Sequence, residues 1–354
     1  MTLIQSAGPS GALRVRRVTL AAAAYIVASW VAGALTLPAS AVTSFRPPNA
    51  LLVAAALLDA PEHWWLYALA TIPGNPTLFM RAPRFAVAGF VFANFSEVAM
   101  SIVLVRRLIG HGRCGTLANC ARFVAIAVGA SALASGIGAG AAVFERAGRT
   151  YMSIWRNWFF ADALTYITLV PVILLVAHKR WRITRERRWE ATGLVVGLVV
   201  MSTLALDGSF GPVSRLPALV YSPLPFLLWA AVRFGPLENA LTVLTMSGVV
   251  LTMALAGRGA FAGLSPADSA LSMQLLVFIV AVPLMFLAAV VDEHRESEER
   301  FRKIFHATPD AITLSMRDDG RLLDVNERFE QVSGIARAAA IGRTGVELAL
   351  WTDT

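Results

Sequence analysis

The sequence predicts an all-α bundle of transmembrane helices followed by a small, partial α+β module. Hydrophobic residues make up 56% of the 354 residues and charged residues only 15%, whereas a soluble domain carries about 25% charged residues. The mean hydropathy is +0.62. Long apolar segments recur up to Val291, and the chain then becomes mostly charged from Asp292 to Lys303.

A spanning helix needs about 20 apolar residues, because each residue rises about 1.5 Å through a hydrocarbon core about 30 Å thick. Ten apolar segments approach this length or reach it. They cover residues 18–37, 45–59, 64–80, 84–105, 121–143, 155–178, 189–207, 216–233, 237–256 and 270–291. About ten spans are therefore expected.

Two of these segments, 45–59 and 64–80, are shorter and carry prolines at 47, 48, 73 and 76. They form either two full spans or one re-entrant hairpin. Irregular backbone at membrane depth is tolerated only where protein or a watery cavity satisfies its polar groups. Both alternatives return the chain to the same side, so the topology after them is the same.

Lys and Arg set the sidedness. They concentrate around residues 14–17, 106–122 and 179–188, which a ten-span arrangement places on one side. Cytoplasmic loops carry an excess of Lys and Arg, so this side is predicted to be the cytoplasm. The net charge of +8 then reflects membrane topology, and we do not expect nucleic-acid binding. No cleaved leader is expected either, because the polar start runs into an apolar segment long enough to span.

The last apolar segment is predicted to continue as a cytoplasmic helix, since no proline lies between Asp292 and Pro309. A heptad-like seam follows it at steps of three and four residues. The seam consists of Leu287, Val291, His294, Glu298, Phe301 and Phe305. It can pair with a second copy in a homodimer, or it can be a solvated connector. We assign signal relay to its last four members.

Residues 301–354 read as a small α+β unit. Strands are expected over 311–316 and 321–325, joined by the Asp318-Asp319-Gly320 turn. Asn326 can cap a helix over 327–332, because its side-chain oxygen can accept from free backbone N–H groups. Gly334 suits the position after that helix. Thr344 to Glu347 has the pattern of a capping box that opens another helix.

The run 297–344, with "RDDGRLLDVNERF" and "IGR" in it, resembles the opening half of a PAS domain. The resemblance implies that 306–354 is an incomplete PAS domain lacking three further strands, and we expect the sequence to be part of a longer protein. PAS domains often bind flavin or haem. No cysteine follows Cys120, and His306 cannot be assigned to haem, so the cofactor stays unknown.

The membrane part resembles the first class of membrane-associated sensor domains, the MASE family. The matching pieces are "FRPPNALLVAAALL" (45–58), "HWWLYALA" (63–70), "NFSE" (94–97), "WRNWFFADAL" (155–164) and the segment 265–295. The resemblance implies a position in the bacterial inner membrane, in front of a histidine kinase or a diguanylate cyclase. The chain itself is expected to carry no catalytic domain, and the stimulus of such domains is mostly unknown.

Ionisable residues inside a membrane are costly and often functional. Glu97 and Asp162 lie within predicted spans, and Asn94 shares a helix face with Glu97. We hypothesise that Asn49, Asn94, Glu97, Asn157 and Asp162 converge on a buried site that binds a small ligand or a cation, or that titrates. The alternative is that these groups only join helices through hydrogen bonds.

Other patterns carry less information. Cys114 and Cys120 are expected to be reduced thiols, and we find no metal-ligand spacing and no nucleophile–base arrangement. The glycine-rich run 136–140 predicts close helix packing.

The expected organisation is a membrane sensor over 1–291, a signalling helix over 292–305 and the partial PAS domain over 306–354. Two rival functions remain: a transporter or membrane enzyme with a regulatory domain, and a simple membrane anchor.

Overall fold

The computed structural model describes residues 11–34, 36–37, 42–43, 45–73, 75, 83–110, 116–143, 150–178, 183–206, 220–255 and 264–350. The chain forms two compact units, Met1–Asp292 and Glu293–Thr354. Cys114, Pro76 and several basic residues of the predicted cytoplasmic loops, such as Lys179 and Arg180, lie outside the described residues.

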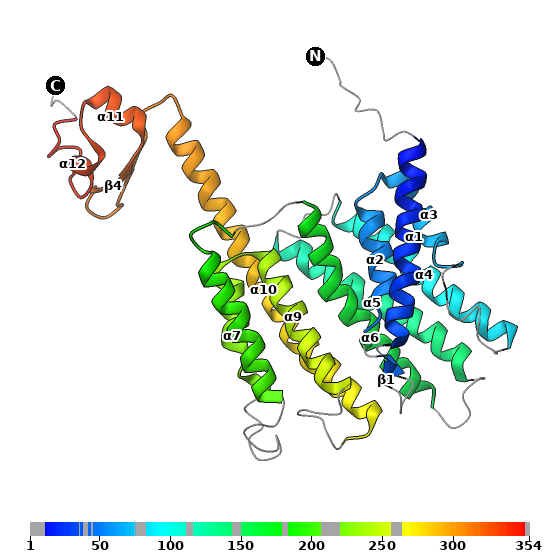
Figure 1. Ribbon diagram of the computed structural model, residues 1–354. Helices are drawn as coiled ribbons and strands as arrows, with labels where there is room; N and C mark the ends of the chain where they lie inside the picture. The colour runs from blue at the N-terminus through cyan, green and yellow to red at the C-terminus, as the bar shows by residue number, and fades with distance from the viewer. Residues whose placement is uncertain are drawn as a thin grey trace. The chain divides into compact units, whose positions relative to one another are not determined.

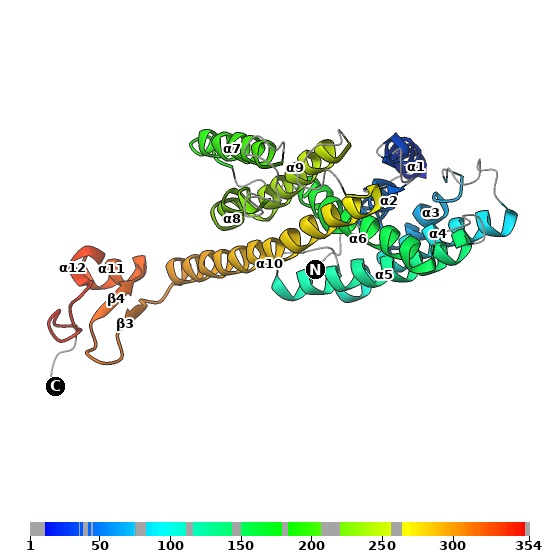
Figure 2. The ribbon, with the colours of Figure 1, turned by 90° about the horizontal axis from the view of Figure 1, so that it is seen from below.

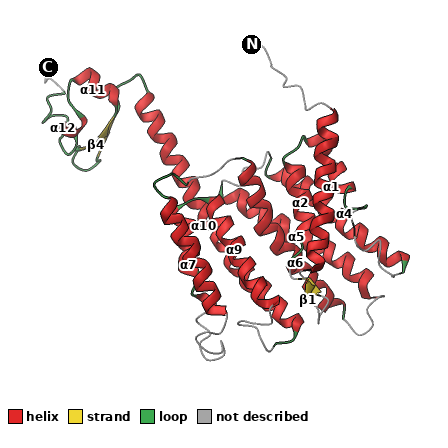
Figure 3. Cartoon of the chain, viewed as in Figure 1, coloured by secondary structure: helices red, strands yellow, loops and turns green. Residues whose placement is uncertain are grey.

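The first unit is a bundle of helices lying side by side (Figures 1 and 2). Among the described residues, seven helices are long and apolar enough to cross a membrane. They are α1 (Gly11–Ala34), α4 (Arg84–Leu108), α5 (Leu117–Val143), α6 (Tyr151–Ala177), α7 (Arg188–Leu206), α9 (Pro236–Leu255) and α10 (Pro266–Ala307). Figure 3 shows that helix dominates the unit, with a small hairpin of β1 (Thr36–Leu37) and β2 (Val42–Thr43) after α1.

The other three predicted segments contain shorter helices. These are α2 (Pro47–Leu57), α3 (Trp64–Leu69, preceded by the 3-10 turn η1, Pro61–His63) and α8 (Leu224–Arg233). The 11 residues of α2 reach only about 16 Å at 1.5 Å per residue. Prolines mark where two of these helices begin, because proline is tolerated in the first helical turn, where its missing N–H would be unpaired. Pro47 and Pro48 open α2, and Pro225 stands in the first turn of α8.

The loop after α2 nevertheless reaches one end of the bundle. Near the start of α1, Arg17 Nη1 lies 3.3 Å from Asp59 Oδ1. At the end of α4, Arg106 donates to the carbonyl of Pro61 at 2.6 Å and to that of Asp59 at 3.0 Å. Helix α2 and residues 59–61 therefore bring the chain to this end of the bundle, whereas α4 starts at the opposite end.

The same end of the bundle also holds the last turns of α10 before Asp292. Arg122 of α5 donates to the Leu108 carbonyl at 3.3 Å, and Cys120 Sγ lies 3.8 Å from the Met285 carbonyl. From the start of α9, Asn239 donates to the carbonyl of Leu284 at 3.3 Å. The beginning of α1 and the exit of α10 therefore lie at one end, as an even number of crossings requires.

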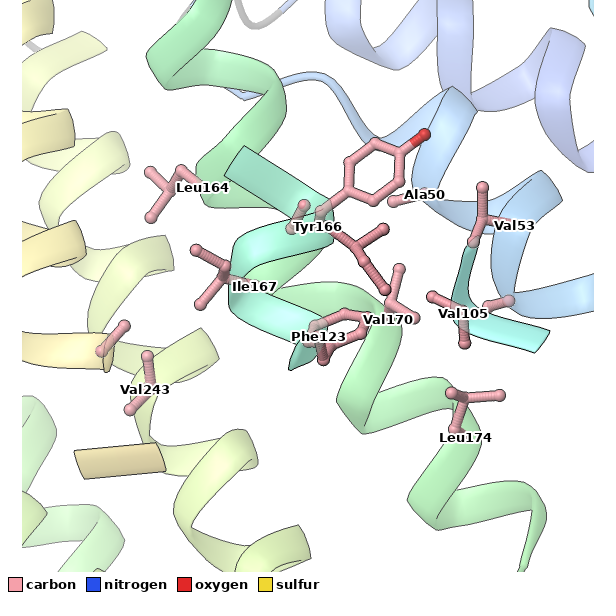
Figure 4. Close-up of a cluster of buried hydrophobic side chains, with 14 of the residues drawn as sticks. Ala50, Val53, Val105, Phe123, Leu164, Tyr166, Ile167, Val170, Leu174 and Val243 are labelled. Carbon is pink, nitrogen blue, oxygen red and sulfur yellow. The ribbon is translucent and has the colours of Figure 1, made fainter. Parts of the chain in front are cut away.

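The core of the bundle lies where α2, α4, α5 and α6 meet. Figure 4 shows Ala50, Val53, Val105, Phe123 and Tyr166 in one cluster of buried side chains, and all five are at most 2% exposed. Small residues let the helices approach closely. A Cβ added to Gly89 of α4 would lie 2.6 Å from the Cβ of Ala141 in α5.

The second unit contains the end of α10 and a small antiparallel sheet. Strands β3 (Thr313–Ser315) and β4 (Leu322–Val325) are shorter than predicted, and the turn before β4 uses Gly320 at φ +69°. Helices α11 (Glu327–Ser333) and α12 (Arg337–Ala340) follow. A hydrogen bond from Arg337 lowers the pKa of the Asp324 carboxyl.

The predicted capping box at Thr344 makes both of its hydrogen bonds. Thr344 N donates to Glu347 Oε2 at 3.0 Å, and Glu347 N donates to Thr344 Oγ1 at 3.2 Å. Residues 345–349 nevertheless form turns and not the expected helix. A capping box fixes where a turn of backbone begins and not how far a helix continues.

Asn326 joins three parts of the second unit, so Asn326→Ala is expected to destabilise it by about 2–3 kcal/mol. Its Oδ1 accepts from the N–H groups of Phe329 and Ile312, and its Nδ2 donates to the Asp310 carbonyl, each at 2.9 Å. Hydrogen exchange of the backbone amides over residues 312–329 in the intact chain measures this loss of stability. Asn326→Asp keeps the acceptor and should give an intermediate effect, and equal exchange in all three proteins would contradict this role.

Candidate polar site inside the helical bundle

Glu97 lies near the middle of α4 and is 1% exposed. Two neutral donors hold its carboxylate. Asn49 Nδ2 donates to Glu97 Oε2 at 2.6 Å, and Ser131 Oγ of α5 donates to Glu97 Oε1 at 2.8 Å. Asn49 Nδ2 also donates to Asn94 Oδ1 at 2.8 Å. Three helices therefore meet through one hydrogen-bonded cluster.

Asp162 lies near the middle of α6 and is also 1% exposed. Its charged neighbour is Arg46, whose Nη1 lies 3.5 Å from Asp162 Oδ2. The Arg46 guanidinium also lies 4.3 Å from the ring centre of Trp158, within cation–π range. The Arg46 backbone N–H donates to Thr165 Oγ1 at 3.0 Å. Trp158, Asp162 and Thr165 share one face of α6, and Arg46 covers that face.

The broken start of α2 explains how Arg46 and Asn49 reach these carboxylates. Pro47 and Pro48 fix φ near −65° and can begin a helix at once. The helix therefore starts inside the bundle, with Arg46 before its first turn and Asn49 within it. The N-terminus of a helix carries partial positive charge, so the start of α2 favours the nearby carboxylates. A single short segment thus serves both Glu97 and Asp162.

The structure brings together four of the five predicted residues. Asn49, Asn94 and Glu97 are directly hydrogen-bonded, and Asp162 joins the same region through Arg46. Asn157 is different. It is 7% exposed, and neither of its amide atoms has a hydrogen-bond partner in the part of the chain that the structure describes.

Sequence reasoning missed Arg46, Ser131, Trp158 and Thr165 as members of the site. Arg46 lies outside the three basic clusters from which the sidedness was predicted. Two signals could have identified it. A buried aspartate needs a counter-ion, and Arg46 is the basic residue beside the proline pair that precedes Asn49.

The predicted relay residues all lie in the last part of α10. His294 Nε2 is 3.1 Å from Glu298 Oε1, and both side chains are exposed. The rings of Phe301 and Phe305 stack with centroids 5.6 Å apart. Phe301 is 56% exposed and Phe305 only 5%, so one ring of the stack is covered within this unit and the other is available for contact.

Gly138 supports the site from α5, and Gly138→Ala is expected to destabilise the bundle by about 1–3 kcal/mol. An added Cβ would lie 2.1 Å from the Trp158 ring, so the ring that underlies Arg46 would have to move. Gly140→Ala is the matched control, because a Cβ there meets nothing within 4 Å. Thermal unfolding in detergent compares the two variants, and equal midpoints would contradict the close packing of Gly138.

The described residues also limit the chemistry of the bundle. Nowhere among them do three His, Cys, Asp or Glu side chains gather as metal ligands. Cys120 is buried. Long apolar helices around buried polar and charged side chains define a multi-pass membrane protein with a polar centre, joined to a small α+β unit.

The chain belongs to the MASE1 family, whose family model matches residues 16–295. The PAS domain model matches residues 299–353. No curated protein and no solved structure is significantly similar to the chain. Both matched domains are sensory and neither is catalytic, so the chain is a membrane-embedded sensory input region of a signalling protein.

Proposed function

We propose that the bundle is a two-state receptor in the bacterial inner membrane that signals through α10 to the PAS domain, and from there to a histidine kinase. The observation that carries this proposal is the continuity of α10. One helix, Pro266–Ala307, contains core residues of the bundle such as Val277 and Leu284, and also the residues that lead into the PAS domain. A shift or rotation of the helix in the bundle would therefore reach its last turns.

The polar cluster is the proposed site of the stimulus. When all three groups are ionised, Glu97 and Asp162 contribute two negative charges and Arg46 one positive charge, which leaves one negative charge in excess. Such an excess is costly at membrane depth. A proton, a small cation or a polar ligand with a cationic group would neutralise it and favour one bundle state over the other.

A path from this cluster to α10 runs through α6. Asp162 lies on α6, and Phe160 of the same helix packs edge-to-face on Phe278 of α10, with centroids 6.2 Å apart. A change at Asp162 that moves α6 would therefore alter a direct contact of α10.

We assign the cytoplasm to the end of the bundle where α1 begins and α10 exits. Arg17, Arg106, Arg107, Arg122 and Arg233 all belong to helix ends on this side. Arg233 at the end of α8 is bonded to Glu190 at the start of α7 at 2.9 Å, which places these two helix ends together. The positive-inside rule then orients the whole bundle.

We further propose that two copies pair along the seam of α10. His294, Glu298 and Phe301 are exposed on it. A homodimer would cover the open face of the Phe301 ring and give the two relay helices a common axis.

A transporter is the second candidate, favoured by one observation. The short helix α2 begins inside the bundle with its N-terminus near two carboxylates, and transporters use such broken helices at their binding sites. Flux of protons or Na⁺ in proteoliposomes tests this candidate. Flux that Glu97→Gln abolishes would support it, and the absence of flux would favour the receptor.

The proposed function is tested in a chimaera in which residues 1–305 replace the input region of a bacterial sensor histidine kinase. Glu97→Gln and Asp162→Asn each change the charge of the site by one unit. If this changes the balance of the two states by about 1.4 kcal/mol, autophosphorylation changes about tenfold. Glu186→Gln is the control, because it makes the same change on an exposed loop. Identical autophosphorylation in all the correctly inserted variants would leave the bundle as an anchor only.

A further inference from the structure

A cavity of about 220 Å³ lies between α6, α9 and α10. Leu244, Gly248 and Leu251 line it from α9, and Met273 and Val277 line it from α10. The cavity is partly open, because Gly248 on its wall is exposed, so an apolar molecule can enter it from outside the bundle. An apolar cavity of about 150 Å³ is enough to bind benzene.

The lining is poorly suited to water. Phe45 and Leu164 complete the wall, and Ser247 is the polar member among the described lining residues. The Ser247 hydroxyl already donates to the Val243 carbonyl at 2.8 Å. A buried water needs about two to four polar partners, and this wall offers too few. The occupant that fits is therefore apolar.

Neighbouring charges also limit the occupant. Phe45 directly precedes Arg46, and Leu164 directly precedes Thr165. The backbone N–H of Arg46 donates to the Thr165 hydroxyl at 3.0 Å, so the cavity lies next to the polar cluster. Arg46 is already paired with Asp162, and Glu97 leaves this region with an excess of negative charge. An anionic amphiphile would be repelled there, whereas a neutral molecule would not.

We propose that this cavity binds a neutral apolar molecule, a ring system or short hydrocarbon chain on the order of ten carbon atoms. Such a molecule would contact α9 and α10 at the same time, and would reach the cavity from the surrounding bilayer. It would favour the bundle state in which these helices are separated by its width. The binding of an apolar molecule does not depend on the proposed function. Only its effect on α10 rests on the proposed function.

Gly248→Leu is designed to fill the cavity from α9. A Cβ added at Gly248 meets nothing within 4 Å, so a side chain can enter without an initial clash. Gly129→Leu is the matched control, since a Cβ added at Gly129 in α5 also meets nothing within 4 Å. Val277→Phe fills the cavity from α10 and serves as a second variant if Gly248→Leu does not fold.

The measurement is equilibrium binding of radiolabelled naphthalene to the full chain in detergent micelles, corrected for protein-free micelles. Wild type and Gly129→Leu are expected to bind one molecule saturably, and to unfold at a higher temperature when it is bound. The filled variants should lose at least about tenfold in affinity. Absence of saturable binding to wild type, or equal binding by the filled variants, would overturn the proposal and leave the proposed function untouched.

The source of the natural occupant is tested in the same system. Added dioleoylphosphatidylethanolamine, which carries no net charge, assigns the cavity to a lipid acyl chain if it displaces naphthalene from wild type. Binding that the lipid does not change assigns it to a free apolar solute. Both results support an apolar ligand site, provided that the filled variants have lost naphthalene binding.

Discussion

Replacing Arg46 by methionine is expected to destabilise the bundle by about 3–5 kcal/mol, because breaking a buried ion pair leaves an uncompensated charge. Asp162 is 1% exposed, and Arg46 is its charged partner at 3.5 Å. Glu97 keeps Asn49 and Ser131 as donors, so the loss falls mainly on Asp162. Titration with SDS in mixed micelles measures the free energy of unfolding.

Three further variants make this prediction specific. Arg46→Lys keeps the charge but loses the planar stack on Trp158, so its effect should be intermediate. Arg84→Met removes an exposed arginine at the start of α4 and should change little. The double variant Arg46→Met/Asp162→Asn should recover much of the lost stability, because both members of the pair are then uncharged. Equal losses in the single and double variants would contradict the pairing.

The second large effect concerns the phase of α10. One alanine inserted after Glu296 turns everything beyond it by about 100°, whereas seven residues restore the phase to within about 20°. If α10 transmits rotation, the first insertion should change autophosphorylation of the kinase chimaera about tenfold or more, and the second should retain the wild-type level.

A control insertion separates phase from length. One alanine between Thr184 and Arg185 extends an exposed stretch between α6 and α7 and should have little effect on autophosphorylation. An output that falls steadily with the number of inserted residues, regardless of phase, would contradict transmission through α10. That result would favour a flexible connector after Val291.

Hydrophobic length was enough to predict the seven long helices, because a spanning helix needs about 20 apolar residues whatever its neighbours are. It could not show that α2 begins inside the bundle. The prolines at 47 and 48 predicted an interruption of the helix, but the depth at which α2 begins depends on tertiary contacts with α4 and α6. The same limit explains Arg46, because counting basic residues by loop does not show a side chain that folds back onto Asp162.

In the PAS unit, short sequence motifs predicted the positions of a turn and a helix cap. The Asp-Gly turn and the cap at Asn326 lie where the sequence placed them, since each depends on a few neighbouring atoms. The extent of the strands and the absence of a helix over residues 345–349 depend on packing that no short motif encodes.

Thiol labelling of single-cysteine variants tests the central claim most directly, namely that the start of α1 and the residues after Asp292 share the cytoplasm. Arg16→Cys, Tyr151→Cys and Ser297→Cys are introduced after Cys114 and Cys120 are replaced by serine, and all three positions are exposed. A membrane-impermeant maleimide should label positions 16 and 297 only in inverted vesicles, and position 151 only in intact spheroplasts. Labelling of position 297 from outside the spheroplasts would contradict the receptor interpretation.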